Sequence, residues 1–270
     1  IHLRSRVIIE KVDDGFMVGD KLFDRVVVTV GGCPKASRLD FLSSLDLAIV
    51  PPVPSLFTFN ISGNWHQRLM GTVVEDVTVS LAGTKHKSHG AILLTHWGMS
   101  GPAILKLSSY AARHLAENDY KGTIAINWCG GRNEEIMRQS LGNMMAANAQ
   151  KLITNAYPSH LTQSHWLVML ERAGIPVTQR WGALNKKHIN RLVTTLTADV
   201  HHITGRCHFK EEFVTAGGIS LSEINIKTME SKRYPGLYFA GEVLDVDAIT
   251  GGFNLQAAWS MAYVVARNFK

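Results

Sequence analysis

The last part of the chain joins an apolar run, an acidic residue, a glycine pair and a helix in an order that few folds accommodate. Residues 237–240 are typical of a buried strand, which leads into Gly241-Glu242, and a loop then ends in Gly251-Gly252 directly before a helix that starts near Asn254. Glycines let another molecule approach the backbone closely, and a helix start presents unpaired N–H groups and the positive end of a dipole. The pattern predicts an α/β fold with a corner suited to an oxyanion or to the polar edge of a ring. A plain strand-to-helix turn, with Glu242 as a solvated acid, is the alternative that these residues leave open.

The start of the chain predicts further strands. Residues 5–32 contain three apolar or β-branched runs, RVIIEKV, FMVG and RVVVTV, separated by turns rich in Asp and Gly. The run over residues 26–30 is apolar on both alternating faces, so we expect it to be buried on both sides of a layered sheet. A short helix with three leucines on one face, Leu39, Leu42 and Leu45, follows. Residues 51–54, PPVP, cannot continue a helix and predict a stiff extended connector at a domain boundary.

The expected secondary structure changes twice in the middle of the chain. Residues 56–98 are strand-like, with Gly and Asn at the breaks, and a helix is expected from Pro102, capped by Ser100 or Gly101, before a strand at TIAINW. Residues 133–200 predict an all-helical insert that begins with the cap residue Asn133, and strand-like sequence resumes with CHFKEEFVTAGGISL.

Charge and cysteine content limit the classes of function. The formal net charge of +6 is spread along the chain, so it indicates a generally basic surface more than a nucleic-acid groove, although an anionic partner stays possible. The three cysteines, Cys33, Cys129 and Cys207, are too few and too far apart for a disulfide framework or a zinc site, which favours a cytoplasmic protein. No run has the features of a signal peptide or a membrane span, and a start at Ile1 inside strand-like sequence suggests a piece of a longer protein.

Several motifs together resemble one known family. GLYFAGEVLDVDAITGGFNLQAAWS resembles the carboxy-terminal flavin motif of the bacterial BaiN/YhiN-like NAD(P)/FAD-dependent oxidoreductases. VVVTVGG resembles the family's strand ending in A-T-G-G, PPVPSLFTF its domain connector, LLTHWGMSGPAILKLS its T-H-x-G-x-S-G-P segment and FVTAGGISL its V-T-x-G-G-V segment. These pieces occur in the family's order and cover nearly the whole chain, least clearly the helical insert.

The resemblance implies which residues meet the cofactor FAD. Gly241 and Glu242 would lie by the ribityl chain and pyrophosphate, and residues 251–256 would run beside the isoalloxazine ring. Val7 matches the strand position whose backbone meets the adenine. The implied cofactor-binding residues are Val7, Thr29, Gly31, Gly32, Gly241, Glu242, Gly251, Gly252, Phe253, Asn254, Leu255 and Gln256.

Two departures from the family pattern affect these expectations. The G-x-G-x-x-G loop that supplies the family's pyrophosphate site is absent, so we expect the chain without an upstream amino-terminal segment to bind FAD weakly or not at all. The stretch Cys33-Pro34-Lys35-Ala36-Ser37 replaces a longer glycine-rich segment of many relatives, which puts the local cofactor contact in doubt. An exposed or domain-swapped sheet edge is expected where the missing segment would pair.

His96 is the candidate catalytic residue. It ends an apolar strand just before a glycine turn and a helix, where it would face the flavin as a proton donor or substrate anchor. A capping or packed histidine is the alternative. No metal site is expected, because His201, His202 and His208 have no acidic or cysteine partner at metal-ligand spacing.

The sequence therefore predicts an α/β protein: a partial Rossmann-like FAD-binding domain with an inserted β-barrel-like domain that carries a helical subdomain. The expected FAD-binding parts are residues 1–50 and 222–270, the β-rich domain is residues 51–132 with a return strand at 206–221, and the helical insert is residues 133–205. The expected function is an FAD-dependent oxidoreductase that transfers a hydride between the flavin and an unidentified substrate, with NAD(P)H as a possible electron donor. The alternatives are a basic β-rich module that binds RNA or protein, and a flavoenzyme acting on an RNA base.

Overall fold

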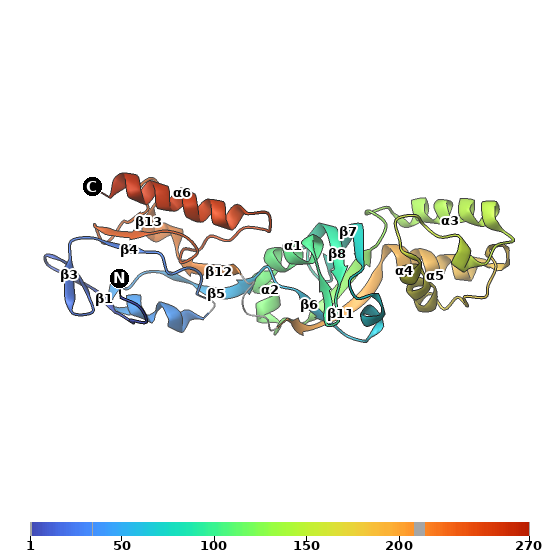
Figure 1. Cartoon of the computed structure of the whole chain (residues 1–270), viewed down its shortest axis with the longest axis horizontal. Helices are drawn as coiled ribbons and strands as arrows, with labels where there is room; N and C mark the ends of the chain where they lie inside the picture. Colours follow the sequence, from blue (N-terminus) through green and yellow to red (C-terminus); the bar gives the residue numbers. More distant parts are fainter. Residues whose placement is uncertain (1, 34, 208–213, 270) are drawn as a thin grey trace. The chain divides into compact units, whose positions relative to one another are not determined.

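The computed structural model describes residues 2–33, 35–207 and 214–269 (Figure 1). It divides into two compact units: unit 1 takes residues 1–56 and 210–270, and unit 2 takes residues 57–209. Unit 1 is thus built from both ends of the chain, and unit 2 is inserted between them. Pro34 in the CPKAS stretch, His208 and the rest of residues 208–213 lie outside the described residues.

Unit 1 begins with a three-stranded antiparallel sheet. Its strands are β1 (Ile9–Val12), β2 (Gly15–Val18) and β3 (Lys21–Phe23). Glycine is needed at the start of β2, because a Cβ on Gly15 would lie 2.4 Å from the Phe23 carbonyl oxygen. The sequence predicted β1 and β2 and missed β3, whose three side chains are all exposed and leave no alternating pattern to detect.

A second sheet of unit 1 carries the end of the chain. Its order is β13 (Ile224–Asn225), β14 (Glu230–Ser231), β15 (Leu237–Phe239) and β4 (Val26–Val28), with β15 and β4 parallel. Helix α6 (Phe253–Asn268) follows β15 and contributes Val265 to the hydrophobic core of this unit. The predicted strand at residues 237–240 and the helix behind the glycine pair are confirmed.

The prediction that residues 26–30 are buried on both faces is wrong. Val28 is only 3% exposed, but Val27 is 38% exposed and Val30 is 56% exposed. The physical reason is that β4 stands at the edge of its sheet, with β15 as its neighbour among the described strands, and that Val28 alone of these three joins the hydrophobic core. An exposed sheet edge was expected, and β4 is one.

The stretch expected to connect two domains is a paired strand of unit 1. The 3-10 helix η1 (Ala36–Leu45) buries Leu39, Leu42 and Leu45, as predicted. The proline-rich stretch expected to be a connector lies within β5 (Ile49–Ser55), which pairs with β12 (Val214–Ile219). Gly217 permits this pairing at its irregular point, because a Cβ there would lie 2.6 Å from the Pro51 carbonyl oxygen.

Unit 2 contains a closed antiparallel β-barrel, which confirms the barrel-like domain. Its strands are β6 (Phe59–Ile61), β7 (Val73–Leu81), β8 (Lys87–Leu94), β9 (Gly98–Ser100), β10 (Gly122–Asn127) and β11 (Asp199–Arg206), in the order β10-β11-β6-β9-β8-β7. The 3-10 helix η2 (Trp65–Leu69) joins β6 to β7. The predicted helix after the T-H-W-G-M-S-G-P motif is α1 (Pro102–Tyr110), which starts after Gly101 and continues into α2 (Ala112–Glu117).

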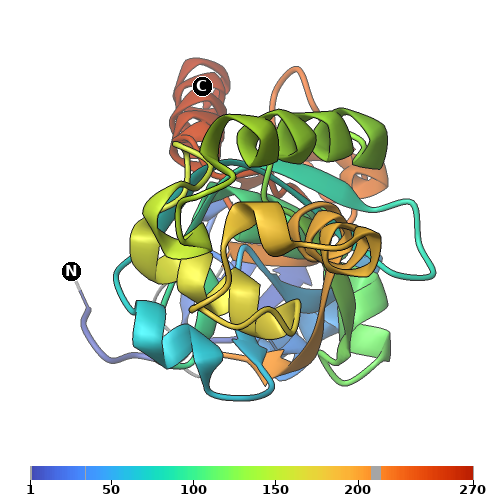
Figure 2. The ribbon, with the colours of Figure 1, turned by 90° about the vertical axis from the view of Figure 1, so that its right-hand side faces the viewer.

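The helical insert contains three α-helices and ends before residue 199, because residues 199–205 of the expected insert belong to the barrel strand β11. Figure 2 looks onto the insert: α3 (Glu134–Asn148), α4 (Gln163–Arg172) and α5 (Lys186–Thr197) lie between β10 and β11 in the chain. Short 3-10 turns, η3 (Ile153–Asn155) and η4 (Trp181–Ala183), connect them. Side-chain caps start all three helices: Asn133, Thr162 and Asn185 each accept a hydrogen bond from a backbone N–H in the first turn. None of the described helices has both the length and the hydropathy needed to cross a lipid bilayer.

Candidate functional site

Glu242 joins three segments of unit 1 at one corner. Its carboxylate accepts a hydrogen bond from the Thr215 backbone N–H of β12 at 3.0 Å. A Cβ built on Gly32 would lie 3.2 Å from the Glu242 carboxyl carbon and 2.6 Å from the Thr215 hydroxyl oxygen. A side chain at position 32 would therefore have to displace the Thr215 side chain or the Glu242 carboxylate. The end of β4, the end of β15 and β12 thus meet at this acid.

The start of α6 lies open behind its glycine pair. Gly252 is the residue before the helix and has a φ of 85°, while Gly251 has a φ of 130°. Helix α6 has no side-chain cap hydrogen bond, and a Cβ built on Gly252 would meet no described heavy atom within 4 Å. The first backbone N–H groups of α6 are consequently left for another partner, at the positive end of the helix dipole.

The loop between β15 and α6 is tied down by specific contacts. The Asn254 side chain accepts a hydrogen bond from the Ala248 N–H at 2.8 Å and donates one to the Ala248 carbonyl at 2.9 Å. Asp247 accepts a hydrogen bond from the Ser55 hydroxyl at 3.0 Å, and the Gly241 N–H donates to the Met261 sulfur at 3.3 Å. The loop is held in shape before any ligand arrives, which lowers the entropic cost of binding.

Cys33 lies beside this corner and is buried. Burial raises the pKa of the Cys33 thiol; Arg38 acts against this rise and Glu242 adds to it. The thiol is therefore protonated at neutral pH and is a poor nucleophile.

The structure brings four of the residues predicted to bind the cofactor together at the Glu242 corner. Gly31 and Gly32 follow β4, Gly241 and Glu242 follow β15, and Gly241 packs against α6, where its built Cβ would lie 3.8 Å from Ala258. Two details refine the prediction. The Asn254 side chain is used by Ala248, so that residue offers its backbone N–H, and the Gln256 amide donates to Ser260 at 3.2 Å.

Thr29, Phe253, Leu255 and Val7 were also predicted to contact the cofactor. Thr29 is exposed next to the end of β4, and the Phe253 and Leu255 side chains are 55% and 67% exposed. Val7 lies by the three-stranded sheet, 3.5 Å from a Cβ built on Gly19, so its contact with an adenine stays a prediction.

His96 belongs to unit 2, in the turn between β8 and β9. Its ring is exposed and packs edge-on against Trp97, with ring centroids 4.3 Å apart, and its carbonyl accepts a hydrogen bond from the Gln67 amide. The ring is therefore accessible for a proton transfer, and its role toward the flavin stays a prediction.

A buried polar network in unit 2 was not predicted from the sequence. Asp199, at the start of β11, is 3% exposed and accepts hydrogen bonds from the Trp128 indole at 3.0 Å, the Arg172 Nε at 2.9 Å and the His201 Nε2 at 2.7 Å. Burial by itself raises the pKa of Asp199, but His201, Arg172 and Trp128 together outweigh burial, and the net shift is downward. A lone Asp before an alternating strand gives no signal for such a network.

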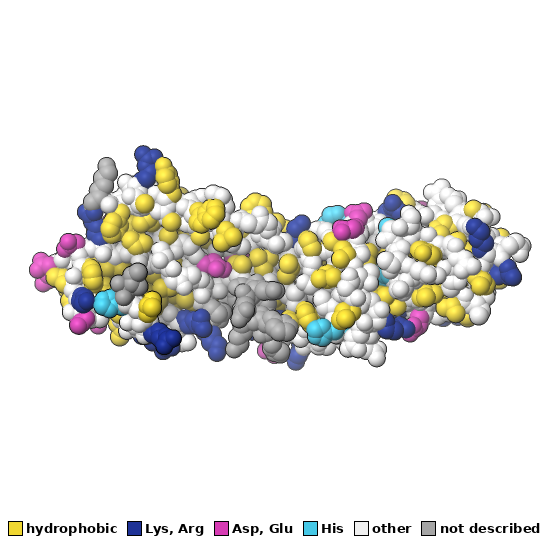
Figure 3. All heavy atoms as spheres, viewed as in Figure 1, with side chains coloured by type: hydrophobic (Ala, Val, Ile, Leu, Met, Phe, Trp, Pro, Cys, Tyr) yellow, Lys and Arg dark blue, Asp and Glu magenta, His cyan; other side chains and the backbone are white. Residues whose placement is uncertain are grey.

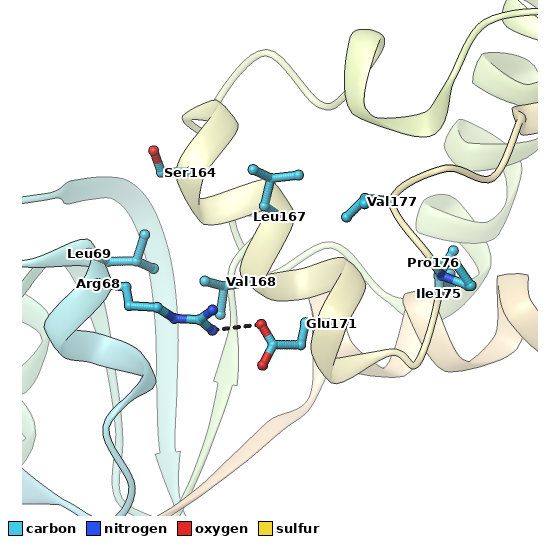
Figure 4. A pocket seen from close by; sticks show the side chains of 9 residues that line it. All are labelled: Arg68, Leu69, Ser164, Leu167, Val168, Glu171, Ile175, Pro176 and Val177. Atoms are coloured by element: carbon cyan, nitrogen blue, oxygen red, sulfur yellow. Dashed lines mark hydrogen bonds and ion pairs between the residues drawn. The ribbon is translucent and has the colours of Figure 1, made fainter.

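An apolar cavity of about 470 Å³ lies between η2 and α4 of unit 2 (Figure 4). Six of its lining residues are apolar, and three are polar: Leu69, Leu167, Val168, Ile175, Pro176 and Val177, with Arg68, Ser164 and Glu171. Arg68 extends across to Glu171, and their ion pair of 2.7 Å is exposed to solvent on both sides. None of the residues predicted from the sequence lines this cavity.

A family model described as "HI0933-like protein barrel and H2TH domain" matches residues 53–214. The match covers more than half of the chain, including the closed barrel and all three helices of the insert. The chain belongs to the HI0933-like (BaiN/YhiN) family of flavoprotein oxidoreductases. The family resemblance inferred from the motifs is confirmed.

Three proteins similar to this chain carry names that state a reaction. The chain is 30% identical over 204 residues to "Ribosomal RNA dihydrouridine synthase" of Escherichia coli and 30% identical over 227 residues to the protein of the same name from Haemophilus influenzae. It is 26% identical over 261 residues to "3-dehydro-bile acid delta(4,6)-reductase" of Clostridium scindens. The matches cover 75%, 82% and 90% of this chain.

The chain spans about half the length of these relatives, namely 47%, 52% and 61% in the same order. The part that this chain does contain fits a flavin. Gly31 and Gly252 both have positive φ angles and open space where a side chain would stand, and the uncapped start of α6 offers N–H donors. Such a corner can receive the polar edge of a planar ring and stabilise negative charge on it.

Proposed function

We propose that the complete protein is a flavin-dependent reductase and that the glycine corner of unit 1 holds the ring of FAD. FAD, when bound, supplies a ring that takes up and releases a hydride at its N5 atom. The observation that carries this proposal is the open, uncapped start of α6 behind Gly251 and Gly252, in a member of a flavoprotein family.

The residues of this chain would orient the cofactor and tune it. The N–H groups of the first turn of α6 provide positive potential where negative charge develops on a reduced ring. Glu242 has one carboxylate oxygen bonded to Thr215, and the other is available to accept from cofactor hydroxyls. His96 is the proposed proton donor, because its ring is exposed and imidazole is a common general acid in enzymes.

The proposed substrate is an unsaturated ring, in the first place a uracil base in RNA. The names of all three relatives describe the reduction of a carbon–carbon double bond, in a uridine or in a bile acid. RNA is favoured over a steroid because the two relatives at 30% identity carry the RNA name and because the net charge is +6.

The proposal is tested with the full-length protein that contains these residues. We expect it to be purified yellow, with a flavin absorbance band that bleaches when NADPH is added without oxygen. Ribosomal RNA from a strain that lacks the protein should then gain dihydrouridine, measured by mass spectrometry of its nucleosides. A colourless protein that takes up no added FAD would contradict the proposal, and salt-dependent RNA retention by such a protein would favour the binding-module alternative.

A further inference from the structure

A second cleft of unit 2 lies between the end of α4 and α5, and five of its seven lining residues have polar side chains. Its volume is about 440 Å³, and it is lined by Arg172, Ala173, Gly174, Asn190, Arg191, Thr194 and Thr195. Arginine, asparagine and threonine side chains supply hydrogen-bond donors, and the lining contains no carboxylate. This composition differs from that of the apolar cavity beside Arg68 and suits an anion.

Arg172 is held in place before any ligand binds. Its Nε and Nη2 donate to buried Asp199, its Nη2 also donates to the Val200 carbonyl at 3.3 Å, and its guanidinium stacks over the Trp65 ring at 5.5 Å. Its side chain is nevertheless 28% exposed. No described residue accepts a hydrogen bond from the remaining nitrogen, Nη1, so this nitrogen is the donor that Arg172 can offer to an anion in the cleft that it lines.

Helix α5 adds further donors to the opposite wall. Arg191 is exposed, and no described acidic side chain forms an ion pair with it. The Asn190 side-chain oxygen accepts from Arg138 of α3, which leaves its N–H₂ group as a donor. The Thr194 hydroxyl completes the set. Glu135 lies 4.0 Å from Arg138, and Glu171 pairs with Arg68, so both nearby acids are directed to other partners.

One feature of the cleft opposes anion binding. The negative end of the α4 dipole lies at Arg172 and Ala173. The turn that follows limits this effect, because the N–H groups of Ala173, Gly174 and Ile175 bond back to the last carbonyls of the helix at 2.9 Å each. Asp199 already balances the charge of Arg172, so the charge that outweighs the residual half charge of the helix end is that of Arg191.

We propose that this cleft binds a phosphodiester group of RNA and so helps to hold the RNA substrate. The inference rests on the proposed function, because it assigns to the reductase a separate site for the backbone of its substrate. Phosphate contacts position a nucleic acid without reading its sequence, which suits an enzyme that must present one base to a cofactor.

The test compares Arg191→Gln with Lys121→Gln in the full-length protein. Lys121 is also an exposed cation. It precedes β10 at the end of the β10–β11 pair that lies far from Asp199, because Gly122 pairs with Ile203 while Ile126 pairs with Asp199. Binding of a fluorescein-labelled RNA oligonucleotide is measured by polarisation over a series of salt concentrations. For Arg191→Gln we expect affinity to fall about tenfold and the slope of log K against log salt to fall by about one, with no change for Lys121→Gln.

Two further measurements distinguish a failure of the cleft proposal from a failure of the flavin proposal. Flavin content and NADPH-driven bleaching should be unchanged in Arg191→Gln, so a loss of either would point to the flavin proposal and not to the cleft. Equal RNA binding by the two variants would overturn the cleft assignment. A second result would also overturn it: inorganic phosphate or NADP⁺ binds at the cleft, but Arg191→Gln does not change RNA binding. The site would then serve a free anion.

Discussion

Asp199 is a carboxylate removed from water and surrounded by donors. Removing an ionised carboxylate from water costs several kcal/mol, and only hydrogen bonds and opposite charge offset that cost. Trp128, His201 and Arg172 provide both around Asp199, and they come from the end of β10, from β11 and from α4. The network therefore joins the barrel to the helical insert through one residue.

Loss of this carboxylate should destabilise unit 2. We expect Asp199→Ala to lower the free energy of unfolding by about 3 to 5 kcal/mol, because it leaves the Arg172 charge and the Trp128 indole without their partner. Asp76→Ala is the control: Asp76 pairs with His89 at 3.1 Å, but both side chains are more than half exposed, so we expect a change of about 1 kcal/mol or less. Urea unfolding of both variants measures the difference, and equal losses would contradict the account.

His165 should make stability depend on pH. It is fully buried, neither ring nitrogen has a hydrogen-bond partner among the described residues, and burial lowers its pKa to about 4, with Asp199 opposing this shift and His160 adding to it. A histidine with a lowered folded-state pKa takes up its proton in the unfolded state first, so stability is lost as the pH falls below about 6.5. The loss at about pH 5.5 should be roughly 1 kcal/mol or somewhat more.

The variant His165→Phe tests this dependence. Phenylalanine keeps a ring against Trp128, where the ring centroids now lie 4.6 Å apart, and has no proton to gain. Thermal unfolding at about pH 7 and pH 5.5 should therefore differ less for His165→Phe than for the natural protein, while His202→Gln, at an exposed position, should behave like the natural protein. An unchanged pH dependence in His165→Phe would show that other groups cause it.

The sequence could identify some of these functional and structural residues but not others. Gly32, Gly241, Glu242 and Gly252 belong to motifs in which glycine and acid stand at fixed positions, so the sequence could single them out. Asp199 and His165 act through partners from distant parts of the chain, such as Trp128 and Arg172, and no local pattern links these residues.

At the scale of elements, the T-H-W-G-M-S-G-P segment is explained by strand packing. Gly98 pairs with Asn60 where β9 meets β6, and a Cβ there would lie 2.2 Å from the Phe59 carbonyl oxygen. Gly101, before α1, has a φ of 94°, and its Cβ would lie 2.8 Å from the Ala91 carbonyl oxygen. These glycines let the short strand β9 close the barrel, whatever part His96 takes in chemistry.

Barrel closure should therefore depend on Gly98. We expect Gly98→Ala to cost about 3 kcal/mol or more, because the new methyl group must displace backbone. Gly83→Ala is the matched control: Gly83 also has a positive φ, 73°, but open space around it, so its cost should be about 1 kcal/mol. The measurement is the urea midpoint of each variant, and a Gly98→Ala protein as stable as Gly83→Ala would refute the packing argument.

The elements with regular patterns were predicted, and those without were not. Helices α3, α4 and α5 carry caps and a 3.6-residue period that a sequence reveals. The apolar run ending in β4 looked like a central strand, but burial depends on neighbours that the local pattern does not contain. For the same reason the sequence indicated β-rich structure in residues 56–98 but not the strand order that closes the barrel.

At the scale of the whole molecule, α6 presents an apolar stripe to solvent. Leu255, Trp259 and Tyr263 lie four residues apart and are 67%, 69% and 62% exposed, and Figure 3 shows hydrophobic side chains gathered over this helix. A stripe of this kind is typical of a surface that contacts more protein. Because the chain spans about half the length of its relatives, we expect the complete protein to cover it.

The central claim is that the corner before α6 receives the flavin, and FAD affinity tests it most directly. The full-length apoprotein is titrated with FAD, and quenching of flavin fluorescence gives Kd for the natural protein, for Gly252→Ala and for Gly83→Ala, which introduces a methyl group at a similarly open glycine of positive φ. We expect Gly252→Ala to raise Kd about tenfold or more, equivalent to about 1.4 kcal/mol, and Gly83→Ala to leave it unchanged. Equal affinities for all three proteins would contradict the claim.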